Sequence, residues 1–95
     1  PYLTIAAQIH AGLHGLRQRL VPPPAAETPY APGHPALPQQ LADALDALTA
    51  DNVLQQGLGV PMVALYRAIK RQELARHAQA EDKPAWERRE YFGRY

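Results

Sequence analysis

The chain has 95 residues, of which 46% are hydrophobic, and ten Lys and Arg against nine Asp and Glu give it a formal net charge of +1. This length bounds it to one small domain or less, and so balanced a charge argues against a dedicated nucleic-acid binder. The absence of cysteine excludes a disulfide framework and a thiolate metal site. No apolar run approaches the ~20 residues that cross a bilayer. A core this small contributes only about 3–5 kcal/mol net, so we expect the chain to depend on a partner.

The first predicted helix covers residues 2–20. Its apolar residues recur at helical spacing: Leu3, Ile5, Ala6, Ile9, Leu13, Leu16 and Leu20. Arg17 and Arg19 fall in the last turn, where cations complement the helix dipole. Because no capping residue precedes Tyr2, we expect the chain to be a piece cut from a larger protein.

A proline-rich connection, residues 21–38, follows this helix and holds seven of the ten prolines. Proline fixes φ and lacks an N–H, which excludes a helix or a central strand here. We expect an extended surface connection, partly in the polyproline II conformation. A recognition motif for a proline-binding domain is the alternative. Tyr30 lies in the middle of this connection, and its small or polar neighbours predict partial exposure.

A second helix is predicted over about residues 39–48, with only a weak N-cap at Gln39 or Pro38. Its apolar stripe opposes two aspartates, Asp43 and Asp46; the stripe consists of Leu41, Ala44, Leu45 and Leu48. Asp51 then predicts the N-cap of a short helix over residues 52–56. Gly57 and Gly59 end that helix, as glycine commonly does, and Leu58 between them is expected to be buried.

A third long helix is predicted over about residues 61–78, with Pro61 in its first turn. Its buried face is predicted by an i, i+3, i+4, i+7 stripe, which consists of Met62, Leu65, Tyr66 and Ile69. Val63 and Leu74 widen this stripe. Its outer face is basic, through Arg67, Lys70, Arg71 and Arg76. Such a face could touch nucleic acid, but we favour a solvated face because the net charge adds no support. Glu73 and His77 form a favourable i, i+4 pair when the histidine is charged.

The last predicted helix lies within residues 82–95, with Asp82 or Lys83 as its cap and Pro84 in its first turn. Tyr91, Phe92 and Tyr95 fall on one side of it. Trp86 falls roughly opposite, and we expect it to pack on a different neighbour or on the preceding loop. With no strand pattern and no internal repeat, the sequence predicts an all-α fold, a small bundle of four to five helices. The predicted parts are a helix at 1–20, a loop at 21–38 and helices at 39–95.

Few residues suggest chemistry. His10 and His14 stand at i, i+4, a spacing that can hold zinc, but no catalytic Glu follows His10 and no third ligand is evident. His34 and His77 lie on other segments. We favour a partly exposed pair or contacts to a missing partner. The chain has no serine or cysteine nucleophile, and the Gly57–Gly59 stretch lacks the strand and lysine of a phosphate loop. We therefore assign no catalytic, cofactor-binding or metal-binding residue.

Taken in order, four motifs resemble the glutamine synthetase family over nearly the whole chain. Residues 1–16, PYLTIAAQIHAGLHGL, resemble the family's segment just after the active-site barrel, with His14 where the family usually has Asp. Residues 37–48 resemble its "LP…L-EAL-AL" stretch, and residues 58–74 resemble its "LG..FV..Y..VKR.E" helix. Trp86-Glu87 with Tyr91 resembles the "WE…Y" ending of the branch that includes γ-glutamylpolyamine synthetases.

This resemblance implies the C-terminal helical part of an ATP-dependent ligase. Such enzymes use Mg²⁺ or Mn²⁺ to phosphorylate the γ-carboxylate of glutamate, and ammonia or an amine then displaces phosphate. The family's metal, phosphate and glutamate ligands precede this segment, so none is carried onto the chain, which we expect to be inactive alone. Tyr30 lies near a tyrosine that some family members adenylylate. Its surroundings, Thr28-Pro29-Tyr30-Ala31-Pro32, do not match the motif N-L-Y-D-L-P, and the modification is not carried over.

The resemblance makes the rest of the enzyme the expected partner. A homo-oligomer is also expected. A cytoplasmic setting is the default expectation, and the charge and the short apolar runs predict neither nucleic-acid nor membrane binding. A stand-alone helical interaction or oligomerisation module is the alternative, and a basic-helix nucleic-acid binder is a distant third.

Overall fold

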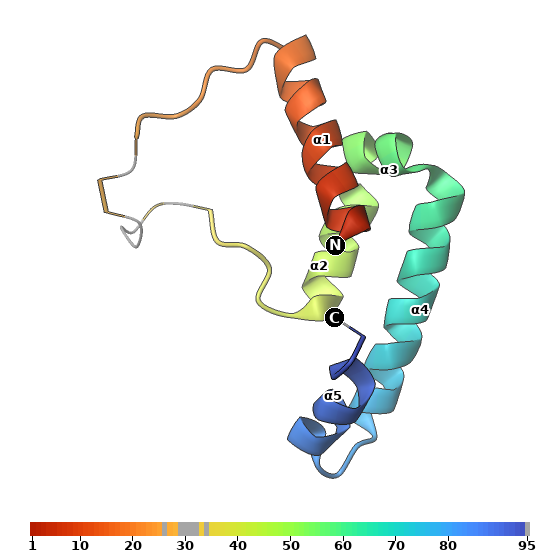
Figure 1. The fold of residues 1–95 in the computed structure, drawn as a ribbon. Helices are drawn as coiled ribbons and strands as arrows, with labels where there is room; N and C mark the ends of the chain where they lie inside the picture. Colours follow the sequence, from red (N-terminus) through yellow and green to blue (C-terminus); the bar gives the residue numbers. More distant parts are fainter. Residues whose placement is uncertain (26, 29–32, 34, 95) are drawn as a thin grey trace. The chain divides into compact units, whose positions relative to one another are not determined.

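The computed structural model describes residues 1–25, 27–28, 33 and 35–94. Tyr30, His34 and Tyr95, on which the sequence raised expectations, lie outside them. The described residues form helices and no strand, so the predicted all-α fold is confirmed (Figure 1). The chain divides into two compact units, Pro1–Val60 and Pro61–Tyr95. The helices are α1 (Tyr2–Arg17), α2 (Leu41–Ala50), α3 (Asn52–Leu58), α4 (Val60–Ala78) and α5 (Lys83–Tyr91).

Helix α1 ends three residues before the predicted boundary at Leu20. Arg19 adopts a positive φ of 51°, which no continuing right-handed helix allows. The amide of Arg19 donates to the carbonyl of Leu16, and the amide of Leu20 donates to that of Gly15. These two bonds form a Schellman motif, which satisfies the last carbonyls of the helix. The sequence gives little warning of this end, because glycine usually takes the left-handed position.

In the first unit, α3 packs against both α1 and α2. Asp51 lies between α2 and α3, and its carboxylate accepts a hydrogen bond of 2.9 Å from the amide of Leu54. This confirms the predicted N-cap. The carboxamide of Gln55 donates to the carbonyl of Thr49 at 2.6 Å, which ties α3 back onto the end of α2. Helix α3 runs through Gly57 and ends at Gly59, whose φ is 91°.

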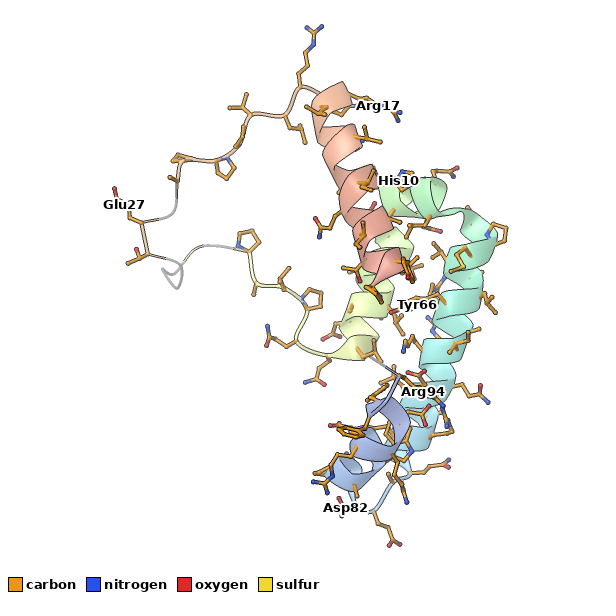
Figure 2. All side chains as sticks on the ribbon, viewed as in Figure 1. His10, Arg17, Glu27, Tyr66, Asp82 and Arg94 are labelled. Atoms are coloured by element: carbon orange, nitrogen blue, oxygen red, sulfur yellow. The ribbon has the colours of Figure 1, made fainter. Side chains whose placement is uncertain are left out.

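The second unit is a hairpin of α4 and α5. Helix α4 begins at Val60, one residue before the prediction, and Pro61 occupies its first turn. Helix α5 begins after Asp82, whose carboxylate accepts from the amide of Ala85 at 2.9 Å. Figure 2 labels Asp82 at this turn. The structure thereby selects Asp82, of the two candidates, as the N-cap, and Pro84 lies in the first turn as predicted.

Little of the described chain is buried. Leu45 and Val63 are its buried apolar residues, each with 3% exposure, and Glu73 is its buried charged residue, with 5%. The α2 stripe is confirmed as the inner face, since Asp43 and Asp46 opposite it are exposed. The predicted buried stripe of α4 is wrong for its main members, because Met62, Leu65 and Ile69 are exposed and Tyr66 is half-buried, whereas Val63, which widens the stripe, is buried. The next helix, α5, is short and polar, and it contacts α4 through ionic residues near the C-terminal end of α4. Leu58, expected to be buried, is half-buried.

Among the described residues, no helix combines the length and the apolar composition that spanning a bilayer requires.

Candidate functional site

A cleft lies between α1 and α3 in the first unit. Its volume is about 520 Å³, and its polar lining comes from both helices. His10, His14 and Arg17 follow one face of α1 at i, i+4 and i+7. Asn52 and Gln56 follow one face of α3 at i, i+4, and Leu13 and Val53 supply apolar wall. The predicted pair of histidines is thus brought together with a guanidinium and two amides (Figure 2 labels His10 and Arg17).

Gly57 sets how closely the two helices of this cleft approach. A Cβ placed on Gly57 would lie 2.5 Å from Cγ and 2.9 Å from Cβ of His10. Real Cβ atoms do not tolerate such distances, and these atoms lie too near the backbone of His10 to swing aside. The imidazole of His10 therefore packs directly on the backbone of α3. His10 is half-buried by this contact, which gives it a structural role that its spacing alone did not predict.

The donors of the cleft are suited to an anion. Imidazolium, guanidinium and carboxamide groups all donate hydrogen bonds, whereas Mg²⁺ prefers oxygen ligands from carboxylates and carbonyls. Within the described part of the chain, no group of three or more His, Cys, Asp and Glu side chains could hold a metal ion. The residues of the cleft therefore do not fit the divalent metals that the resemblance implies.

Helix α1 carries an exposed apolar surface beside the cleft, which we call the α1 stripe. Its members Tyr2, Ile5, Ile9 and Leu16 are 86%, 56%, 55% and 77% exposed. They are spaced at i, i+3, i+7 and i+14 and so lie along one side of the helix. Leu3, Ala6 and His10 lie on the adjoining side and are half-buried. Of the apolar face predicted from the sequence, part is thus packed within the unit and part is presented outward.

In the second unit, Glu90 of α5 joins two arginines. Arg76 of α4 donates to both of its carboxylate oxygens, at 2.9 and 3.2 Å, and Arg94 donates at 3.0 Å. The hydrogen bonds from Arg76, with the positive charges of Arg76 and Arg94, lower the pKa of Glu90 below its usual range. A bidentate pair of this kind fixes direction as well as distance. It aligns α5 on α4.

A second polar contact lies at Glu73, the buried acid of α4. Lys70 donates to its carboxylate at 2.8 Å, and the hydroxyl of Tyr91 donates to the same oxygen at 3.3 Å. Burial, together with the negative charge of Glu73, raises the pKa of the Tyr91 hydroxyl. The ammonium of Lys70 also lies 5.7 Å from the centre of the Tyr91 ring, within the range of a cation–π contact.

The aromatic ring of Trp86 completes the hairpin. It makes edge contacts with His77 of α4, at 5.3 Å between ring centroids, and with Tyr91, at 5.9 Å. The guanidinium of Arg76 lies 5.6 Å from its centre. Trp86 therefore packs on a neighbouring helix, one of the two expected options. It also meets Tyr91, which the sequence placed on the other side of α5.

The ionic partners differ from those that the sequence suggested. Glu73 pairs with Lys70 and Tyr91, while His77 lies 3.0 Å from Glu87 of α5. The basic face of α4 is also less free than expected, because Lys70 and Arg76 are engaged with acids. Sequence spacing finds pairs within one helix, whereas most of these contacts join α4 and α5. The remaining sequence signal was the presence of two acids on α5, Glu87 and Glu90, that can pair with bases on α4.

Comparison with known proteins identifies the family of this chain. The model of the glutamine synthetase catalytic domain matches residues 1–91. A γ-glutamylanilide synthase of Acinetobacter sp is 36% identical over 102 aligned residues, covering 97% of this chain and 20% of that protein. A γ-glutamylethanolamide synthetase of Streptomyces coelicolor is 35% identical over 96 residues, covering 99% of this chain and 20% of that protein. A glutamine synthetase of Methanocaldococcus jannaschii is 35% identical over 82 residues, covering 77% of this chain and 18% of that protein.

The chain belongs to the glutamine synthetase family. It spans about a fifth of the length of these relatives, and its all-α fold is that of the C-terminal helical part of the catalytic domain. No solved structure matches it significantly.

Proposed function

We propose that this chain is the C-terminal helical part of an ATP-dependent ligase, which joins the γ-carboxyl of glutamate to an amine through γ-glutamyl phosphate. The match of residues 1–91 to the family's catalytic domain carries this proposal. Two relatives that cover nearly the whole chain are named for anilide and ethanolamide products, which favours an organic amine over ammonia. A motif of the chain agrees, since Trp86-Glu87 with Tyr91 resembles the ending of the amine-using branch.

Within such an enzyme, the role proposed for this chain is structural. ATP and Mg²⁺ or Mn²⁺ would be held by other parts of the protein, and the chain alone would be inactive. The exposed α1 stripe supports this role. Burying large apolar side chains such as Ile5 and Ile9 against a partner lowers the free energy. We propose that the stripe packs on the remainder of the catalytic domain. The exposed Met62, Leu65 and Ile69 of α4 would help subunits of a homo-oligomer to pack.

The test is a ligase assay on the full-length protein, with glutamate, ATP and Mg²⁺. Aniline, ethanolamine, a polyamine and ammonia are offered separately, and phosphate release is measured beside the γ-glutamyl product. We expect product with at least one organic amine at a higher kcat/KM than with ammonia. A full-length protein that forms no γ-glutamyl product from any of these acceptors would contradict the proposal.

The α1 stripe equally favours a second candidate, a helical module that associates through this surface. Light scattering on the 95-residue chain separates the two. A chain that assembles into a defined oligomer through the α1 stripe, in a protein without ligase activity, would support the module.

A further inference from the structure

We propose that the cleft between α1 and α3 binds a small oxyanion, the phosphate or carboxylate group of a metabolite. This site is separate from the chemistry proposed above, since that chemistry is assigned to other parts of the protein. The cleft has about 520 Å³ of space, which exceeds the volume of one phosphate group and leaves room for a small organic body.

The charge of the cleft fits an anion. Arg17 is always protonated and offers a planar fork of donors that matches two oxygens of a phosphate or carboxylate. His10 and His14 add donors, and each also adds positive charge when protonated. None of the residues that line the cleft is acidic. Asp51, next to the cleft residue Asn52, has its carboxylate engaged with the amide of Leu54.

The geometry of the cleft brings donors in from two sides. Arg17 and His14 come from α1, while Asn52 and Gln56 face them from α3. The contact of His10 with Gly57 fixes the two helices against each other, so the backbone positions from which the donors extend are set before a ligand arrives. Preorganised donors cost less entropy on binding. Leu13 and Val53 make one part of the wall apolar, and an apolar wall lowers the local dielectric and so strengthens charge interactions beside it.

The experiment measures how anions protect the histidines of the full-length protein from diethylpyrocarbonate, with peptide mass spectrometry to follow each histidine. Inorganic phosphate and acetate are tested separately against chloride at constant ionic strength. We expect one of these anions to slow modification of His10 and His14 about threefold, the factor for an anion at about twice its Kd. His77, which lies in the other unit, is the internal control. Stronger protection by phosphate identifies a phosphate ligand, and stronger protection by acetate a carboxylate.

Variants assign the protection to the cleft. In Arg17→Gln the protection of His10 and His14 is lost, whereas Arg19→Gln, the same change two residues away and outside the cleft, keeps it. Gln56→Leu, which removes a donor from exposed α3 surface, weakens protection and serves where Arg17→Gln disturbs folding. Absence of protection by both anions, or equal loss in the Arg17 and Arg19 variants, would overturn the proposal. Because the readout is chemical protection, it does not depend on ligase activity.

Discussion

A close contact between α1 and α3 depends on the absence of a single atom. Gly57 has no Cβ, and His10 of α1 occupies the space where that Cβ would lie. Sequence reasoning assigned Gly57 to the end of the short helix, because glycine commonly ends helices. The structure keeps Gly57 inside α3, where its small size rather than its backbone freedom is needed. Nothing in the local sequence distinguishes these two uses of glycine.

Gly57→Ala is expected to destabilise the first unit by about 1–2 kcal/mol, because overpacking costs about 1–3 kcal/mol and alanine returns up to about 1 kcal/mol of helix propensity. Urea unfolding followed by circular dichroism measures this. Gly15→Ala is the matched control, since a Cβ there meets no atom within 4 Å; it should stabilise α1 by about 0.5–1 kcal/mol. Adding His10→Ala to Gly57→Ala should recover part of the loss. A Gly57→Ala variant as stable as Gly15→Ala would refute the close contact.

At the scale of the helix, local signals predicted the starts of helices better than their faces. Asp51 and Asp82 each cap the helix that the sequence assigned to them, since capping needs only residues close in the chain. The end of α1 was missed because Arg19, and not a glycine, takes the left-handed position. The prediction of the inner face of α4 was wrong at most positions, because a periodic apolar stripe does not reveal whether the helix that packs against it is apolar. Here α5 offers Glu87, Glu90 and Tyr91 instead.

Asp51→Ala is expected to destabilise the first unit by about 1 kcal/mol, the usual cost of losing an N-cap. The amide of Leu54 then loses its acceptor, and α3 frays at the end that carries Asn52 of the cleft. Hydrogen exchange at the amide of Leu54 should quicken together with the fall in unfolding free energy. Asp51→Ser keeps a capping oxygen and is the control. Equal exchange rates in the two variants would show that the cap contributes nothing.

Glu90 gives the α4–α5 hairpin a dependence on acid pH. Its pKa in the folded chain lies below the usual range, chiefly through the hydrogen bonds from Arg76. A lowered pKa stabilises the fold at pH values above the usual glutamate pKa, and this contribution is lost as the pH falls through the folded value. The melting temperature should therefore drop between about pH 5 and pH 3. Because the pair is at the surface, added salt should reduce the effect.

Thermal melts of Glu90→Gln test this dependence. The variant should melt below the parent chain at pH 7 and show less loss on acidification, so that the two curves approach each other as the pH falls below the usual glutamate pKa. Glu81→Gln changes an exposed acid in the turn before α5 and should follow the parent at every pH. Parallel curves for the parent and Glu90→Gln would contradict the role given to the Arg76–Glu90 pair.

For the molecule as a whole, the sequence predicted the class of fold, the family and the order of helices. These depend on helical periodicity and on motifs spread along the chain, both of which a sequence displays. It could not predict the α1–α3 cleft, because Arg17 and Gln56 are distant in sequence and meet only after α1 and α3 pack. It also could not divide the apolar residues of α1 into a packed side and an exposed side.

Ile9→Asp tests whether the exposed side of α1 is covered in the full-length protein. In the 95-residue chain, where Ile9 is 55% exposed, the change should alter the free energy of unfolding by no more than about 0.5 kcal/mol. In the full-length protein an unpaired charge placed in an apolar contact costs several kcal/mol, so assembly and activity should be lost. Gln8→Asp, on the neighbouring exposed position outside the α1 stripe, should preserve both. Indistinguishable full-length variants would exclude burial of the α1 stripe.

The hairpin also restricts how α5 can be seated. Residues 73, 76 and 77 of α4 engage Tyr91, Glu90 and Glu87 in antiparallel order. If α5 slid by one turn, about 5.4 Å, all three polar contacts would break together, including the one at buried Glu73. An apolar interface would tolerate such a slide with little penalty. The polar contacts of α4 thus fix one register for α5.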